Sequence, residues 1–162
     1  MTVVAERRAD SPPYQAYAAI IGVYVGGLGV AGLAARLFDR NPACQTGLDF
    51  AVLSAASFKA ARTLAHDEVT SFLRDPFVQG DAHEGDEEPL ESGDFRQAIG
   101  ELVTCSRCGG TWAAAFLASS QILAPRFGRL LTWSLAAAGL NDWLQTGFAA
   151  LTEKANQLEQ RS

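Results

Sequence analysis

The chain has 162 residues, which suits one domain, and 48% of them are hydrophobic whereas only 19% are charged. Its net charge of −5 at pH 7 argues against a nucleic-acid partner, because such proteins present a basic face. Three cysteines are an odd number and argue against the disulfide framework of a small secreted protein. Charge is nearly absent from three stretches and dense in two, which favours a membrane protein over a soluble domain.

The amino-terminal part predicts a membrane anchor. Residues 1–13 are polar and end in two prolines, so we expect a disordered lead. Residues 14–35 carry no charge. This segment is long enough to cross a bilayer core of ~30 Å and too long to be the apolar part of a cleaved signal peptide. Ala18, Gly22 and Gly26 form a stripe of small residues that lets membrane helices approach closely. We favour packing of this stripe within the chain over a contact with a second copy.

A second, less apolar helix is expected over residues 48–65. Lys59, Arg62 and His66 recur at spacings that place them on one face of it. An unpaired Lys or Arg at the centre of a spanning helix costs about 2.5–3.5 kcal/mol on insertion scales. The basic face therefore points into the bundle toward an acidic partner, or the helix is short and lies at the membrane interface.

Residues 67–103 are expected to form an aqueous loop. Asp67 is placed to cap a short helix over 68–74, which must end before Pro76. Residues 80–94 carry seven acidic residues and no Lys or Arg, which is typical of a solvated, flexible segment. Their spacing does not match an EF-hand loop, so we favour the flexible segment over a divalent-cation site.

Cys105 and Cys108 form a CxxC pair just before an apolar helix expected over residues 109–124. Thiols at this spacing can bind a metal, form a disulfide or stay reduced. Zinc is the metal that they would hold with His66, although a second CxxC pair is absent and the ligand set is incomplete. A redox role would draw on Arg107, whose positive charge favours the thiolate, but the chain lacks the βαβ pattern of thioredoxin-like proteins.

The last apolar helix is expected over residues 130–151, antiparallel to its predecessor after a tight turn. Asn141 and Asp142 lie near its middle. An ionisable residue inside a membrane helix is a functional candidate when its partner can be named. Lys59 and Arg62 are the candidate partners of Asp142, and we favour a structural ion pair.

Two separated motifs carry a family resemblance. The first motif is Arg62-x-Leu64-x-x-Asp67 with Arg74-x-Pro76-Phe77 after it, and the second is Glu101-Leu102-x-x-Cys105-x-x-Cys108 with Trp112 after it. Their order and spacing resemble the DUF1360 family of small bacterial membrane proteins, some of which are associated with sporulation.

The resemblance covers residues 48–125 and implies a membrane location, but no settled activity. It marks as candidate site residues those that match the two motifs: Arg62, Asp67, Arg74, Pro76, Phe77, Glu101, Cys105, Cys108 and Trp112. The chain departs from the family between and after the cysteines. It has Ser-Arg and Gly-Gly where members often have proline or aromatic residues, so the local turn is more flexible here.

The sequence thus predicts an all-α integral membrane bundle of about four helices over residues 14–152, with a polar tail over 153–162 that frays. Basic residues beside the spans favour a bacterial cytoplasmic membrane with both termini and the CxxC pair in the cytosol. No catalytic constellation is recognised. We expect an interaction or assembly component whose partners are the lipid bilayer, other membrane or cytosolic proteins, or a second copy of itself. The alternative is a CxxC-dependent metal-binding or thiol-redox membrane protein.

Overall fold

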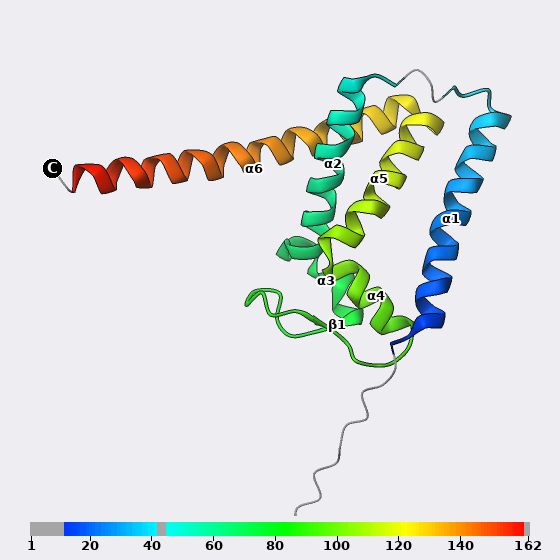
Figure 1. Ribbon diagram of the computed structural model, residues 1–162, viewed down its shortest axis with the longest axis horizontal. Helices are drawn as coiled ribbons and strands as arrows, with labels where there is room; N and C mark the ends of the chain where they lie inside the picture. The colour runs from blue at the N-terminus through cyan, green and yellow to red at the C-terminus, as the bar shows by residue number, and fades with distance from the viewer. Residues whose placement is uncertain (1–11, 42–44, 161–162) are drawn as a thin grey trace, which may run out of the picture.

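The computed structural model describes residues 12–41 and 45–160, and this part of the chain is mostly helical (Figure 1). The all-α class expected from the sequence is therefore confirmed. The expected lead lies, up to residue 11, outside the described residues, as does Cys44. The elements in chain order are α1 (Tyr14–Leu37), α2 (Gly47–His66), the 3-10 turn η2 (Glu68–Thr70), α3 (Ser71–Arg74), the 3-10 turn η3 (Asp75–Phe77), β1 (Val78–Gln79), β2 (Glu88–Pro89), α4 (Phe95–Thr104), α5 (Ser106–Leu123) and α6 (Pro125–Glu159).

Helices α1, α2 and α5 run side by side, and α5 contacts both of the others. The short helix α4 packs against α1, α2 and α5 at the end of the bundle where α1 begins. β1 and β2 form a two-stranded antiparallel ribbon in which Val78 faces Pro89. This ribbon contacts α4 through β2, so the region between α2 and α5 is folded against the bundle.

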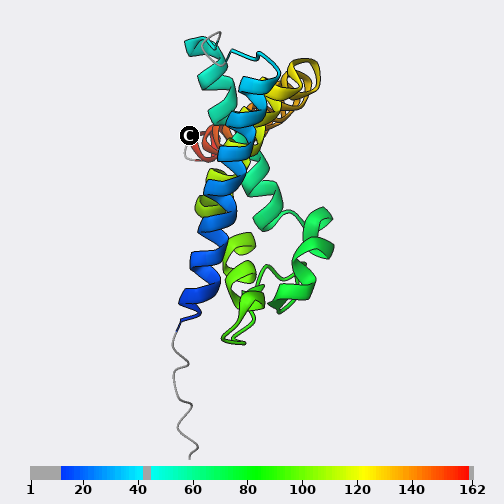
Figure 2. The ribbon, with the colours of Figure 1, turned by 90° about the vertical axis from the view of Figure 1, so that its right-hand side faces the viewer.

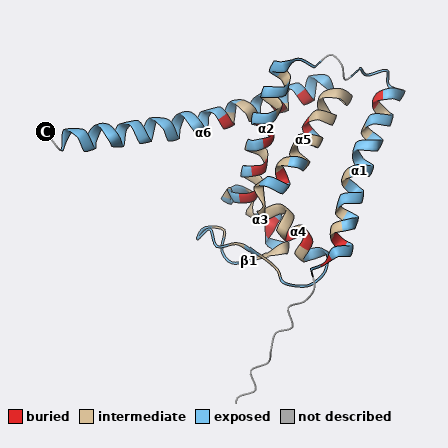
Figure 3. Cartoon of the chain, in the orientation of Figure 1, coloured by how far each residue is buried: buried red, intermediate tan, exposed pale blue. Residues whose placement is uncertain are grey.

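The interior is built from small residues. Six of the seven buried apolar residues in the described part are alanine, and Leu117 is the seventh. Where α5 crosses α2, a Cβ placed on Gly109 or Gly110 would lie 3.8 Å from the Cβ of Ala61, so only small side chains separate the two helices. Figure 3 shows the buried positions along the facing sides of α2, α4 and α5, whereas α1 and most of α6 are exposed.

The second helix has a complete amino-terminal cap. The Thr46 hydroxyl accepts from the Asp49 N–H at 3.2 Å, and the Asp49 carboxylate accepts from the Thr46 N–H at 2.9 Å. This reciprocal arrangement satisfies two of the donors that a helix start leaves open. It fixes the beginning of α2 within one residue of the expected position.

Helix α1 is largely uncovered by the rest of the chain. Among the described helices it alone is long and apolar enough to cross a membrane, and only 6% of its most apolar window is buried. A Cβ added at Gly22 or Gly26 would meet nothing within 4 Å, and Ala18 is exposed. The expectation that this stripe of small residues packs within the chain is therefore wrong. The inner edge of α1 is instead aromatic, with Tyr17 and Tyr24 turned toward α4 and α5.

The region between α2 and α5 is more ordered than expected. It contains a ten-residue helix, α4, whose start is capped by Asp94 through a 2.8 Å bond from the Arg96 N–H. The hydroxyl of Ser92 and the Arg96 N–H lower the pKa of the Asp94 carboxyl. The short helix α3 ends at Arg74, before Pro76 as expected, and Pro76 lies in the 3-10 turn η3 that follows, where a missing N–H is tolerated. Asp67 caps η2 by position only, without a side-chain hydrogen bond.

The last helix departs most from expectation. Helix α6 begins at Pro125, directly after α5, and continues as helix to Glu159, so the expected turn and most of the expected frayed tail are helical. It does not return along α5 but runs crosswise to the bundle and projects beyond it (Figures 1 and 2). Gly128 permits this corner, because a Cβ there would collide with the backbone of Ser120 and Gln121.

Candidate functional site

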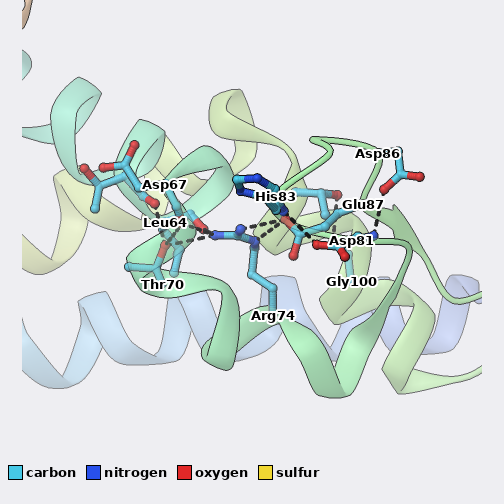
Figure 4. Close-up of polar contacts among 11 residues, drawn as sticks. Leu64, Asp67, Thr70, Arg74, Asp81, His83, Asp86, Glu87 and Gly100 are labelled. Carbon is cyan, nitrogen blue, oxygen red and sulfur yellow. Dashed lines mark hydrogen bonds and ion pairs between the residues drawn. The ribbon is translucent and has the colours of Figure 1, made fainter.

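Arg74 is the polar centre of the folded region. Its side chain is fully buried, and its Nε and Nη2 atoms contact Glu87 Oε2 at 2.8 and 2.6 Å. Its Nη1 atom donates to the carbonyl oxygens of Leu64 and Asp67 at 2.7 and 3.1 Å and to Thr70 Oγ1 at 2.9 Å. Figure 4 shows the guanidinium between the end of α2 on one side and the acidic segment on the other.

The surroundings explain why an arginine occupies this position. The last carbonyl groups of a helix have no partner within the helix and carry partial negative charge, so they favour a cation beside them. Arginine presents several donors in a planar fork and can serve carbonyls and a carboxylate together. Arg74 thus joins the acidic segment to the end of α2 through Glu87, a contact that the sequence did not predict.

Gly100 provides the close approach of α4 to the same region. A Cβ there would run into the carbonyl oxygen of Phe77 and would lie 3.3 Å from Pro89 Cα. The Phe77 carbonyl also accepts from the Leu90 N–H at 3.1 Å, and the Pro76 carbonyl accepts from Arg96 at 2.9 Å. The Pro76-Phe77 motif therefore contributes through its backbone, which receives bonds from the segments that follow it.

A second polar group joins α2 to α6. Lys59 Nζ lies 2.8 Å from Asp142 Oδ2 and 3.6 Å from Asp67 Oδ2. The ion pair anticipated between Lys59 and Asp142 is present. Arg62, the other candidate partner, is exposed and makes no hydrogen bond or ion pair within the described part of the chain; it lines a shallow cavity of about 500 Å³ with Lys59, Asp67 and Asp142. Asn141 is exposed on α6.

A third polar group lies between α1, α4 and α5. The Tyr17 hydroxyl donates to Glu101, and Gln97 Nε2 donates to the other carboxylate oxygen at 2.9 Å. Two turns further along α1, Tyr24 meets Trp112 edge to face with ring centroids 5.1 Å apart. These side chains line an open, mostly apolar cavity of about 350 Å³, into which Cys108 also faces. Glu101 and Trp112 of the second motif are thus the points at which the body holds α1.

The CxxC pair sits at the start of α5. The helix begins at Ser106, three residues earlier than expected, so Cys105 is its amino-terminal cap and its sulfur accepts from the Cys108 N–H at 3.3 Å. Hydrogen bonds from the thiol and the N–H of Cys108, with a smaller contribution from Arg107, lower the pKa of Cys105. Both cysteines are free thiols in this structure, and Cys108 is exposed.

The proposed zinc set is not assembled. Within residues 12–41 and 45–160, no three His, Cys, Asp or Glu side chains are placed to hold one metal ion. His66 is exposed at the end of α2, on the face that carries Lys59 rather than beside the thiols. The expectation that His66 completes a site with Cys105 and Cys108 is therefore wrong.

The side chains of the motif residues consequently have different partners, although Arg74 also donates to the Asp67 carbonyl. Arg74 is held with Glu87, Asp67 with Lys59, and Glu101 with Tyr17. Sequence reasoning missed Glu87, Tyr17 and Gly100. Glu87 is one of seven acids in an otherwise uniform segment, and nothing in the sequence distinguishes it, whereas Gly100 directly precedes the second motif and could have been found there.

These features define a small helical protein with a compact body, an apolar amino-terminal helix held on its side, and a carboxy-terminal helix that projects from it. The family described as "Protein of unknown function (DUF1360)" matches residues 52–148. The chain belongs to this family.

Two curated relatives come from Bacillus subtilis (strain 168). Sporulation protein YjcA is 35% identical over 111 residues, which cover 62% of this chain and 90% of the relative. UPF0713 protein YngL is 30% identical over 105 residues, which cover 61% of this chain and 77% of the relative. No solved structure matches the chain.

Proposed function

We propose that the protein is a small bacterial membrane protein, anchored by α1, that serves as an interaction or assembly component and catalyses no reaction of its own. The observation that carries this proposal is the inverted packing of the body. Alanine fills the interior, while 26 large hydrophobic side chains in the described part of the chain are exposed. Membrane helices associate through small residues and turn large apolar ones to lipid, whereas a soluble core is filled with large apolar side chains.

Helix α1 supports the same proposal. Val23, Val25 and Val30 are each at least 60% exposed, and no other segment of the described residues covers them. The core helix of a soluble protein would be mostly buried, so the low burial of α1 favours the view that lipid, rather than the rest of the chain, covers this helix. Continuous apolar surface of this extent on a water-soluble monomer would be an association hazard.

The orientation that we propose follows from the order of the helices. α1 and α2 run in opposite directions, and α5 runs beside them, so the start of α1 and residues 67–105 lie at one end of the bundle. Arg7, Arg8, Arg74, Arg96 and Arg107 belong to that end in the sequence, against Arg36, Arg40, Arg126 and Arg129 at the other end, and by the positive-inside rule we propose that the first end faces the cytosol. Because α6 lies crosswise at the opposite end, this arrangement separates the two termini, unlike the four-crossing topology expected from the sequence.

Membrane extraction tests the proposal. In isolated bacterial membranes, we expect the protein to stay in the pellet through high salt and alkaline carbonate and to be released by detergent. Val25→Arg, in the middle of α1, should weaken retention, since a central arginine is costly in a bilayer. Val69→Arg is the matched control, because Val69 is equally apolar and exposed but lies in η2. Release of the unaltered protein by carbonate, without detergent, would contradict the proposal.

Thiol labelling tests the orientation. A membrane-impermeant maleimide applied to intact cells should reach Cys44, between α1 and α2 in the sequence, whereas Cys105 and Cys108 should need permeabilised cells. Labelling of the CxxC pair in intact cells would reverse the orientation without affecting the anchor.

A thiol-redox role is the second candidate, and the lowered pKa of Cys105 is the observation that favours it. A thiolate at a helix start beside a second thiol can exchange with a disulfide. Under this alternative, the electrophoretic mobility of the alkylated protein should change between oxidised and reduced cells and the change should vanish in Cys105→Ser and Cys108→Ser. Unchanged mobility together with unchanged partner capture in both variants would eliminate it.

A further inference from the structure

The outer half of α6 carries an apolar seam that no other part of residues 12–41 and 45–160 covers. From Leu140 to Gln160 every residue is exposed. The seam runs along one side of this helix at spacings of four, three, four and three residues, and its members are Leu144, Phe148, Leu151, Ala155 and Leu158. This is the heptad spacing of coiled coils, in which side chains of one helix pack into the holes between side chains of a second helix.

The seam faces away from the protein's own body. Asp142 marks the inward side of α6, because it reaches Lys59 of α2. Leu151 follows Asp142 by nine residues, which at 3.6 residues per turn places it about 180° around the helix. Leu144, Leu151 and Phe148 are 65–73% exposed, so the body neither covers the seam nor blocks access to it.

We propose that this seam, residues 141–158 of α6, pairs with the same segment of a second copy in an antiparallel helix pair. The antiparallel direction rests on the proposed membrane anchoring. Two copies inserted in the same orientation are related by a two-fold axis along the membrane normal. Because α6 runs crosswise to α1, that axis turns the second α6 to run in the opposite direction.

The sequence offers one register that uses the whole seam. Phe148 faces Leu151 of the second copy, and Leu144 faces Ala155, so large and small side chains alternate along the contact. Asn141 then lies opposite Leu158 at either end, where its amide can reach water. Beside the seam, Gly147 faces Lys154 and Gln145 faces Thr152, so no like charges meet.

Charge disfavours the other apolar occupant, a bilayer surface. Helices that lie on membranes carry Lys and Arg on their polar face. Residues 140–160 contain Asp142, Glu153 and Glu159 but only one basic residue, Lys154. An anionic lipid surface would repel this segment. The pairing is short, so the local concentration of anchored chains strengthens it.

Cysteine cross-linking on the full-length chain tests the pairing. Cys44, Cys105 and Cys108 are first replaced by serine, and two differently tagged chains, Leu144→Cys and Ala155→Cys, are expressed together. In isolated membranes, a short bismaleimide should link the two tags on the order of tenfold above the control. The control replaces Leu144→Cys with Glu153→Cys, which is equally exposed but lies on the opposite side of α6. The altered side chains are exposed in the single chain, so the variants should fold.

Each other outcome overturns the pairing. Linking of Leu144→Cys to itself and of Leu158→Cys to itself, without linking of the mixed pair, would mean a parallel pair. No linking together with shielding of Leu151→Cys from a polar maleimide only in membranes would mean that lipid covers the seam. No linking with free labelling would mean that nothing covers it. Carbonate extraction of the same samples reports separately on the α1 anchor.

Discussion

The two halves of α6 follow different packing rules. In the first half, Gly128, Thr132 and Gly139 are buried, and a Cβ on Gly139 would lie 3.2 Å from the Lys59 Cβ. In the second half, from Leu140 onward, no residue is buried although large apolar side chains recur along one face. One continuous helix therefore contributes small residues where the chain packs on itself and large ones where it does not. We infer that the large residues pack against a partner outside the chain.

The body is correspondingly held by polar bonds and close backbone contacts. Arg74 and Gly100 occupy the positions at which bulky apolar side chains would sit in an ordinary soluble core. Substitutions there should therefore reduce the free energy of unfolding strongly. Substitutions in the outer half of α6 should leave it nearly unchanged.

The largest expected effect is that of Arg74→Ala. It leaves the Glu87 carboxylate without its cation and the α2 carbonyls without their donor, and breaking a buried pair in this way costs about 3–5 kcal/mol. Urea unfolding of the full chain in mild detergent measures the loss. Arg62→Ala is the control, because Arg62 is exposed and unbonded in the described structure, and it should change stability by about 0.5 kcal/mol or less. Equal losses in both variants would show that Arg74 does not hold the body together.

Gly100→Ala should come next. The added methyl group would press on the Phe77 carbonyl and on Pro89, and overpacking of this kind costs about 1–3 kcal/mol. Gly147→Ala, in the outer half of α6, is the matched substitution, since nothing lies within 4 Å of its Cβ position. It should gain up to about 1 kcal/mol from helix propensity. If both variants changed stability in the same direction, the body and the outer half of α6 would not differ in packing as we argue.

Asp142→Asn acts at the border between the two halves of α6. The Lys59–Asp142 pair is half-exposed on the Asp side, so its loss should cost about 1 kcal/mol or less and shrink as salt increases. Glu153→Gln, further out on the same helix, removes an equal charge that makes no ion pair within the described structure and should have no such salt dependence. Unfolding measured at low and high salt distinguishes them. A salt-independent loss for Asp142→Asn would mean that the pair does not fasten α6.

The features that depend on local sequence pattern could be predicted from the sequence. The helical class, the bounds of α2 and the partnership of Asp142 with Lys59 followed from periodicity and from the cost of an unpaired charge in a bilayer. The expected turn before residue 130 is wrong, because proline also begins helices and Pro125 is the first residue of α6.

The candidate site was harder to predict because its contacts join distant segments. Which of seven acids meets Arg74, and which tyrosine meets Glu101, depend on how α4 and the β1–β2 ribbon fold back on the bundle. Motif order named Arg74 and Glu101 as candidates, but it did not predict their partners. The structure places them in separate groups with different partners.

The smallest expected effect concerns Cys105, where the capping role and the thiol role can be separated. Serine caps helices well, so Cys105→Ser should leave stability within about 0.5 kcal/mol, whereas Cys105→Ala should cost about 1 kcal/mol. Because the pKa of Cys105 is lowered chiefly by the Cys108 thiol, its alkylation by iodoacetamide in a Cys44→Ser background should reach half its maximal rate below the pH of an ordinary thiol. Cys108→Ala removes that donor and should move the midpoint upward. A midpoint that stays in place would show that Cys108 does not act on Cys105, and the pair would then have only the capping role.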